Sequence, residues 1–307
     1  MSDLCWLCQK NNEAVIHSAN LREDEKTKRL QNQLDHLHLV KQERAAYQDT
    51  VQETKTAVQT LSKRQLCQSM PNSQDMKIHY SFDFAQQVHF PSNPLQPGPI
   101  YFLTPRKCGI FGVCCEAVPQ QVNYLIDEGM CTSKGSNAVI SYIHHFFENY
   151  GFGEKDVDLH CDNCSGQNKN KFLLWYLCWR TLCGLHTSVK LHFLVVGHTK
   201  FAPDWCFGLF KQQFRRTEVS CLDDIAKAVC ASTQVGVNVP QLVGDERGQV
   251  FVNSYDWQSF LDSYFKPLKG IKTYRHFRFD IVISSTIPPA KHILISNFLK
   301  NQSFHFC

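Results

Sequence analysis

The chain has 307 residues, of which 43% are hydrophobic and 20% charged, a composition typical of a folded protein with one main core. Its longest uninterrupted apolar run, residues 172–179, is too short to cross a bilayer, and the first residues, MSDLCWLCQKNNE, lack the basic-then-apolar order of a signal peptide. We therefore expect neither membrane insertion nor export. The fifteen cysteines lie at irregular spacings, several of them inside apolar runs, so we expect reduced, mostly buried thiols in an intracellular protein, nuclear or cytoplasmic.

The N-terminal part of the chain predicts a short cysteine-containing segment, residues 1–18, followed by a long helix over residues 19–64. Cys5 and Cys8 form a CxxC pair, which is half of a zinc site, and no second pair follows at zinc-finger spacing. Residues 19–64 contain neither Gly nor Pro and are rich in Glu, Lys, Gln and Arg. Their apolar residues follow a heptad only in part, so a coiled-coil homodimer and a helix packed on its own domain both remain open.

After a linker at residues 65–75, the pattern changes to alternating strands and helices. We predict strands over 77–83, 108–116, 121–127, 157–161 and 189–196, and helices over 136–150, 168–183 and from Pro203 onward. Two hairpin-like connections followed by strand–helix alternation predict an α/β fold, with a mixed five-stranded sheet flanked by helices over residues 76–232. Residues 233–307, which hold aromatic clusters, are expected to pack on this core as an extension.

Three aspartates mark one edge of the predicted sheet. Asp83 ends the first strand and Asp162 ends the fourth, and these two strands can lie side by side and parallel. Asp204 begins the helix after the fifth strand and can fold over the same edge. Three converging carboxylates repel one another unless cations separate them, and hard oxygen ligands suit two Mg²⁺ or Mn²⁺ ions. Such a pair of ions supports phosphodiester cleavage.

Each aspartate also has a simpler interpretation. Asp83 can cap a following turn. Asp162 lies between Cys161 and Cys164, a CxxC that would form a redox or thiolate site, although an acid inside the motif disfavours that interpretation. Asp204 is in a position typical of a helix cap, and its rivals as a third acid are Glu218, Asp223 and Asp224.

The motifs around these acids resemble those of a known family. The stretches DNCSGQNKN and GHTKFAPDWCFGLFKQQFRR, with the later YDWQSFL and HFRF, look like an uncharacterised transposon-derived domain family. The order of elements resembles the RNase H-like fold of DDE/DDD transposases and integrases, over roughly residues 76–280. This resemblance implies metal-dependent DNA cleavage or strand transfer, with Asp83, Asp162 and Asp204 as the catalytic and metal-binding acids.

Polar and basic residues near the acids complete the expected site. Asn163, Gln167, Asn168 and His198 are candidates for orienting the carboxylates or contacting phosphate, although Asn is also a good turn residue. Residues 169–216 hold eight Lys or Arg and one acid, Asp204, which favours a polyanionic partner. The expected DNA-binding residues are Lys169, Lys171, Lys200, Lys211, Arg215 and Arg216.

Two other functional classes remain open from the sequence. A domesticated DNA-binding protein would keep the fold and lose the activity. A helix-mediated interaction protein would act through residues 19–64. Intact carboxylates at all three positions favour the nuclease or transposase class over both.

Overall fold

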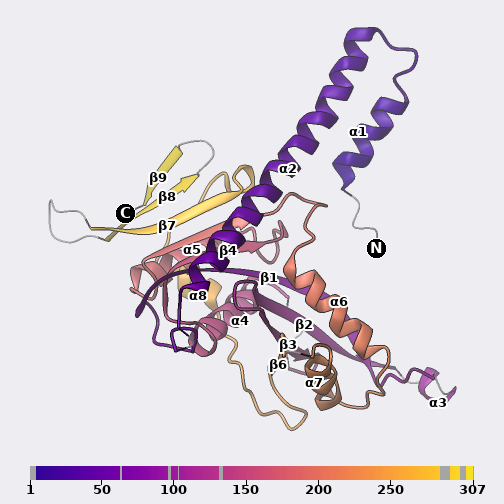
Figure 1. Cartoon of the computed structure of the whole chain (residues 1–307), viewed down its shortest axis with the longest axis vertical. Helices are drawn as coiled ribbons and strands as arrows, with labels where there is room; N and C mark the ends of the chain where they lie inside the picture. Colours follow the sequence, from indigo (N-terminus) through magenta and orange to yellow (C-terminus); the bar gives the residue numbers. More distant parts are fainter. Residues whose placement is uncertain are drawn as a thin grey trace.

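A mixed sheet runs through the centre of the protein in the computed structural model, which describes residues 5–62, 64–95, 98–102, 104–130, 134–234, 236–283, 291–297 and 302–306 (Figure 1). Within these residues the sheet has nine strands in the order β6-β3-β2-β1-β4-β5-β7-β8-β9. The strands are β1 (Gln74–Phe90), β2 (Arg106–Cys115), β3 (Gln120–Asp127), β4 (Glu154–Cys161), β5 (Ser188–Phe193), β6 (Asn238–Leu242), β7 (His276–Ile283), β8 (Lys291–Asn297) and β9 (Gln302–Phe306).

The five expected strands form the middle of this sheet, in the order β3-β2-β1-β4-β5. β1 pairs antiparallel with β2, and β2 antiparallel with β3, whereas β1, β4 and β5 are mutually parallel neighbours. The prediction of five strands was too low, because the C-terminal part of the chain adds β6 beside β3 and β7–β9 beyond β5. These additions cover both edges of the central five strands, which would otherwise expose unpaired backbone groups.

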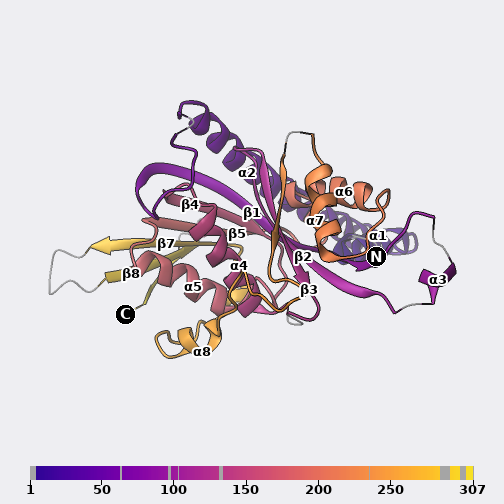
Figure 2. The same cartoon turned by 90° about the horizontal axis from the view of Figure 1, so that it is seen from below.

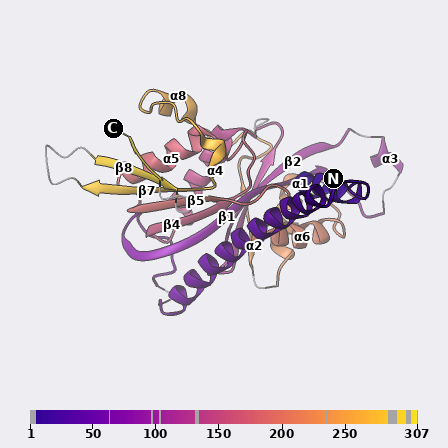
Figure 3. The ribbon, with the colours of Figure 1, turned by 90° about the horizontal axis from the view of Figure 1, so that it is seen from above.

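Helices cover both faces of the sheet (Figures 2 and 3). One face carries α4, α5 and α8, and the other carries α2, α6 and α7. The helices are α1 (Trp6–Ile16), α2 (Glu23–Gln59), α3 (Gly98–Tyr101), α4 (Ser136–Asn149), α5 (Lys171–Leu182), α6 (Ala202–Phe214), α7 (Leu222–Ala231) and α8 (Trp257–Asp262), with a short 3-10 turn η1 (Ile271–Thr273). None of the described helices combines the length and the apolar character needed to cross a membrane.

Strict alternation along the central strands builds the main core under α4 and α5. Ile78, Tyr80 and Phe82 of β1 are fully buried on this side, together with Leu159 and Cys161 of β4. Each such apolar side chain contributes about 1.5–3 kcal/mol through removal from water. A smaller core lies on the other face, where three phenylalanines of α6 pack against β1, β2 and α7.

The expected long N-terminal helix is present as α2, and it does more than project from the domain. Its N-terminal half pairs with α1 and points away from the sheet, while its C-terminal half lies along β1 and β4 (Figures 1 and 3). Val51, Thr54 and Val58 are buried at this contact. The helix begins with Glu23, Asp24 and Glu25, which suit the positive end of the helix dipole.

Candidate metal and nucleic-acid site

β1 and β4 bring Asp83 and Asp162 side by side. The parallel register pairs Ser81 with His160, so two residues further along Asp83 stands opposite Asp162. Phe82, the residue before Asp83, belongs to the core under α4 and α5, and alternation therefore turns Asp83 toward the face of α2 and α6.

Asp83 does not end its strand, as the sequence predicted. β1 continues to Phe90 along β2, after a register shift between Ala85 and Val88. What ends near Asp83 is the pairing with β4, because β4 itself stops at Cys161. The aspartate thus lies where β1 loses its neighbour on one side, which opens space beside a continuous strand.

Asp83 lies within the electrostatic reach of the other two aspartates. Burial is the largest cause of a pKa of about 8 at Asp83, and the charges of Asp162 and then Asp204 contribute to the same rise. A backbone hydrogen bond from the Phe84 amide, 2.8 Å from the Asp83 Oδ1, opposes this shift only in part. A carboxyl group with this pKa is protonated over much of the neutral range unless a cation offsets its surroundings.

The loop after β4 holds Asp162 in place. Asp162 Oδ1 accepts hydrogen bonds from the Asn168 side-chain amide at 2.6 Å and from the Cys164 backbone at 3.0 Å. Asn168 is 1% exposed, so its side chain is confined to this contact. Asn170 caps α5 by accepting from the amides of Phe172 and Leu173. The asparagines of DNCSGQNKN therefore have separate local tasks.

Asn163 fastens the same loop to the neighbouring strand. Its side-chain amide donates to the carbonyl of Leu194, just after β5, and its Oδ1 accepts from the Lys169 ammonium at 2.8 Å. Gln167 contributes its backbone carbonyl, which accepts from the Asn170 side chain at 3.0 Å. Of the three amide residues predicted to orient carboxylates, Asn168 is the one that contacts an aspartate.

Asp204 lies in the first turn of α6 and lines a cleft together with Asp83. Its Oδ2 accepts from the backbone amide of Phe201 at 3.1 Å, so it caps the helix as well. The cap fixes the carboxylate at the cleft wall. The alternative acids Asp223 and Asp224 belong to the start of α7, where Asp224 caps that helix and pairs with Lys227 at 3.0 Å.

The cleft has a volume of about 900 Å³ and is rich in basic groups. Its charged and imidazole-bearing lining residues are Arg44, Asp83, His89, Lys134, His198, Lys200, Asp204 and Lys211. Sequence reasoning missed Arg44 of α2 and Lys134, because neither lies near an acidic motif in the sequence. Lys211 has a lowered pKa, chiefly from burial and then from the nearby Arg215.

The basic residues between 169 and 216 do not form one surface. Arg180 is completely buried and donates hydrogen bonds to the Tyr176 hydroxyl and to His186 Nδ1. Lys171 pairs with Asp262 of α8 at 2.8 Å. The Lys169 ammonium donates a hydrogen bond to Asn163 Oδ1, and burial lowers the pKa of Lys169 to about 8.

Lys200 and Lys211 are the predicted DNA-binding residues that line the cleft. Arg215 and Arg216 are exposed at the C-terminal end of α6, outside the lining set. His198 also lines the cleft, where its Nε2 lies 3.3 Å from the Cys8 Sγ.

A row of four histidines, three of them buried and His192 partly buried, lies on the same face of the sheet, under α2. His160, His192 and His276 are register partners on β4, β5 and β7, and His79 of β1 contacts His160 at 2.9 Å. His276 approaches Glu43 of α2 at 3.0 Å. Sequence reasoning missed this row, although His79, His160 and His192 each lie between two apolar residues in the sequence.

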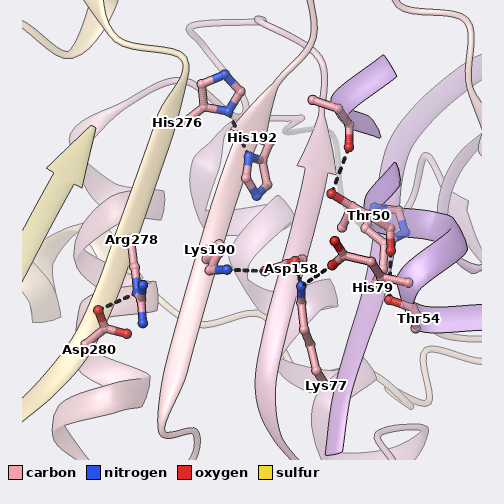
Figure 4. A network of polar contacts seen from close by, with 12 residues as sticks. Thr50, Thr54, Lys77, His79, Asp158, Lys190, His192, His276, Arg278 and Asp280 are labelled. Atoms are coloured by element: carbon pink, nitrogen blue, oxygen red, sulfur yellow. Dashed lines mark hydrogen bonds and ion pairs between the residues drawn. The ribbon is translucent and has the colours of Figure 1, made fainter. Parts of the chain in front are cut away.

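Charged pairs continue the polar layer along the same strands (Figure 4). Asp158 of β4, only 4% exposed at its side chain, receives Lys77 at 2.8 Å and Lys190 at 3.9 Å. Arg278 and Asp280 extend the layer on β7. The strands under α2 therefore carry a continuous layer of polar side chains. Asp83 lies where this layer reaches the cleft.

The donor set at the aspartates fits Mg²⁺ or Mn²⁺. Carboxylate oxygens are the ligands these ions prefer, and a divalent ion would lower the pKa of Asp83, which burial and then two neighbouring carboxylates raise. Among the described residues, the ligand oxygens of the three aspartates do not all lie within 4.8 Å of one another. A different cluster of possible metal ligands does meet this distance among the described residues. It consists of Cys5, Cys8, His36 and His198, whose ligand atoms all lie within 4.8 Å of one another.

Comparison with known proteins gives a family. The model of DUF7869, described as a domain of unknown function, matches residues 104–287, which is more than half of the chain. The chain belongs to the DUF7869 family. No curated protein and no solved structure matches it. The DUF7869 match includes Asp162, Asp204 and most of the cleft wall, whereas Asp83 and α2 precede it.

Proposed function

We propose that this chain is a transposase-derived, divalent-metal-dependent DNA nuclease or strand-transfer domain with an RNase H-like core. The observation that carries the proposal is the placement of Asp83 opposite Asp162 at one end of two parallel central strands, with the charges of Asp162 and Asp204 both acting on Asp83. The central strand order, with three antiparallel strands followed by two parallel ones, supports the RNase H-like assignment.

The three aspartates would hold one or two Mg²⁺ or Mn²⁺ ions. Bound there, the ions would activate a water or hydroxyl nucleophile and stabilise the leaving oxygen of a phosphodiester. The chain's own residues prepare this site: Asn168 fixes Asp162, and the α6 cap fixes Asp204. Because the pKa of Asp83 is raised, a bound cation would favour the ionised form of this carboxyl at neutral pH.

DNA is the partner that the cleft favours. Arg44, Lys134, Lys200 and Lys211 line it beside two of the aspartates, and a basic cleft attracts a phosphate backbone without reading its sequence. Its volume of about 900 Å³ exceeds what a pair of metal ions occupies, which leaves room for a strand of nucleic acid.

The test is cleavage of a supercoiled plasmid and of a labelled duplex over titrations of Mg²⁺ and Mn²⁺. Asp162→Asn keeps the size of the side chain and removes its charge, so cleavage is expected to fall by roughly 10²–10³-fold or more, as for loss of one strong transition-state contact. Asp223→Asn at the start of α7 is the matched control and should cut like the parent.

Folding of each variant is checked by its melting curve. An Asp162→Asn protein that cuts as well as the parent would end the metal-nuclease proposal. A parent chain that binds the duplex and never cuts it would favour the domesticated DNA-binding alternative.

Self-association is a second candidate function, and the hairpin of α1 and α2 favours it. Leu30, Leu34 and Leu37 are 50%, 58% and 43% exposed on α2, at spacings that place them along one side of the helix. A second copy of the hairpin could cover this stripe as a homodimer. Leu34→Glu should then shift the chain from dimer to monomer in light scattering, while Leu95→Glu, at another exposed leucine, should not.

A further inference from the structure

Four metal-ligating side chains meet at the base of the helical hairpin, away from the aspartates. Cys5 precedes α1, Cys8 lies in its first turn, His36 comes from α2, and His198 comes from the turn after β5. Their ligand atoms all lie within 4.8 Å of one another. Cys5 Sγ is 3.3 Å from His36 Nε2, and Cys8 Sγ is 3.3 Å from His198 Nε2.

These spacings are close to those of a tetrahedral zinc site. Zinc binds sulfur at about 2.3 Å and nitrogen at about 2.05 Å, so two such ligands at a tetrahedral angle stand about 3.6 Å apart. The two measured sulfur–nitrogen distances are slightly shorter, as expected for ligands that contact one another without an ion between them. Both cysteines are free thiols, so neither is consumed by a disulfide.

The backbone is shaped to bring the cysteines to this place. Gly197 has a φ of 75°, in the left-handed region, and a Cβ there would lie 2.4 Å from the Cα of Cys5. The glycine thus lets the N-terminal segment pack directly on the turn that carries His198. Cys5 and His36 are 6% and 7% exposed, which is the enclosure typical of a structural site.

We propose that Cys5, Cys8, His36 and His198 bind one zinc ion in a closed, structural Cys₂His₂ site. Two thiolates and two imidazoles select zinc over the hard cations that suit the aspartates. Four protein ligands leave no position for a substrate or water, so the ion's task is to join parts of the chain.

The site joins three segments that are distant in the sequence. It ties α1 to α2, and it ties both helices to residues 197–198, which line the wall of the basic cleft. Arg44, eight residues after His36 on the same helix, lines that cleft too and donates to the carbonyl of Lys200 at 3.4 Å. Zinc would therefore brace the cleft wall from outside.

Metal content is the first measurement. The 307-residue chain, purified with zinc present and then dialysed, should hold one zinc per chain. Cys8→Ser and His36→Gln should bind zinc at least about tenfold more weakly, because each removes a ligand. Cys67→Ser and His38→Gln, at exposed positions outside the cluster, are the matched controls and should keep the zinc.

Cobalt substitution is a second experiment, which uses the parent chain without any variant. Zinc is removed from the parent chain with a chelator and replaced by Co²⁺, whose absorption should show a tetrahedral ligand field and thiolate charge transfer. Full zinc content in Cys8→Ser and His36→Gln, or a parent chain without zinc and without a thiolate band in cobalt, would overturn the proposal. Neither readout involves DNA cleavage, so the zinc site and the nuclease proposal can fail separately.

Discussion

Two neighbouring stretches of one sheet face are polar for different reasons. His79 of β1 and His160 of β4 are almost completely buried under α2, whereas Asp83, four residues after His79 on the same strand, lines an open cleft. Burial keeps the histidines neutral, because it lowers the pKa of His79 to about 3 and that of His160 well below its ordinary value. Burial also raises the pKa of Asp83 to about 8.

The two stretches therefore respond to pH with opposite signs. A histidine that stays neutral in the folded chain binds fewer protons than in the unfolded chain, so its contribution to stability is lost as the pH falls below about 6.5. A carboxyl with a raised pKa binds more protons when folded, so stability is lost as the pH rises toward its folded pKa. The buried histidines therefore lower the stability of the fold at acid pH, and Asp83 lowers it at alkaline pH.

The largest expected effect is acid destabilisation through the histidine row. Between pH 6.5 and 5, His79 alone should lower the free energy of unfolding by about 2 kcal/mol, and His160 and His192, whose pKa values are also lowered by burial, add in the same direction. The measurement is urea unfolding of the metal-free chain across this range. His79→Gln should reduce the pH slope by about one proton; His17→Gln, at an exposed site, should leave it unchanged.

A flat stability profile between pH 6.5 and 5 would contradict the histidine prediction. It would mean that the folded chain accepts protons on these histidines without loss of stability. The opposite pH responses of the histidines and Asp83 would then no longer hold.

The next effect is alkaline destabilisation through Asp83. Between pH 6 and 8 the metal-free chain should lose roughly 2 kcal/mol from this group, after allowance for its partial exposure. Asp83→Asn should abolish the loss, and Mg²⁺ should reduce it in the parent. Asp245→Asn, in a loop remote from the cleft, is the control. Equal alkaline loss in the parent and in Asp83→Asn would remove the aspartates from the explanation.

A smaller effect is expected from the residue that holds Asp162. Asn168→Ala removes the 2.6 Å contact to its carboxylate, and loss of such an outer contact costs about 10–100-fold in metal affinity or activity. The Mn²⁺ concentration for half-maximal cleavage should rise accordingly. Cys164→Ser preserves the backbone amide that Asp162 also uses and should behave like the parent. Identical Mn²⁺ curves for both variants would reduce Asn168 to a loop-packing role.

The smallest effect concerns salt. Lys200→Gln and Lys211→Gln, in the cleft wall, should each lower the slope of log affinity against log salt for duplex DNA by about 0.9 if each contacts one phosphate. Lys171→Gln should not, because Lys171 already pairs with Asp262. The same measurement on Arg215→Gln and Arg216→Gln decides whether DNA extends beyond the cleft along α6.

The sequence was informative where the structure depends on a single strand or motif. Asp83 and Asp162 could be placed together because parallel register and side-chain alternation are regular, and the order of the central strands follows from the spacing of apolar runs. The polar motif after β4 predicted a fixed loop, although which asparagine contacts the aspartate depends on the loop's exact path.

The rest depends on contacts between distant segments. His36 and His198 complete the CxxC pair from positions 31 and 190 residues away from their cysteine partners, so no local spacing reveals them. Arg180 looks like a surface charge in the sequence, yet aromatic and histidine side chains enclose it. The histidine row is visible only once the strands are aligned.

The position of β1 affects the choice of domain boundaries for expression. The family match begins at residue 104, after β1 has ended, yet β1 lies between β2 and β4 at the middle of the sheet. A fragment trimmed to the match would bring together two strands that have no pairing with each other and would lack one of the three aspartates. Expression of this domain for biochemistry should therefore start upstream of α1, so that the central strand, its covering helix and the four Cys and His ligands are inherited as one unit.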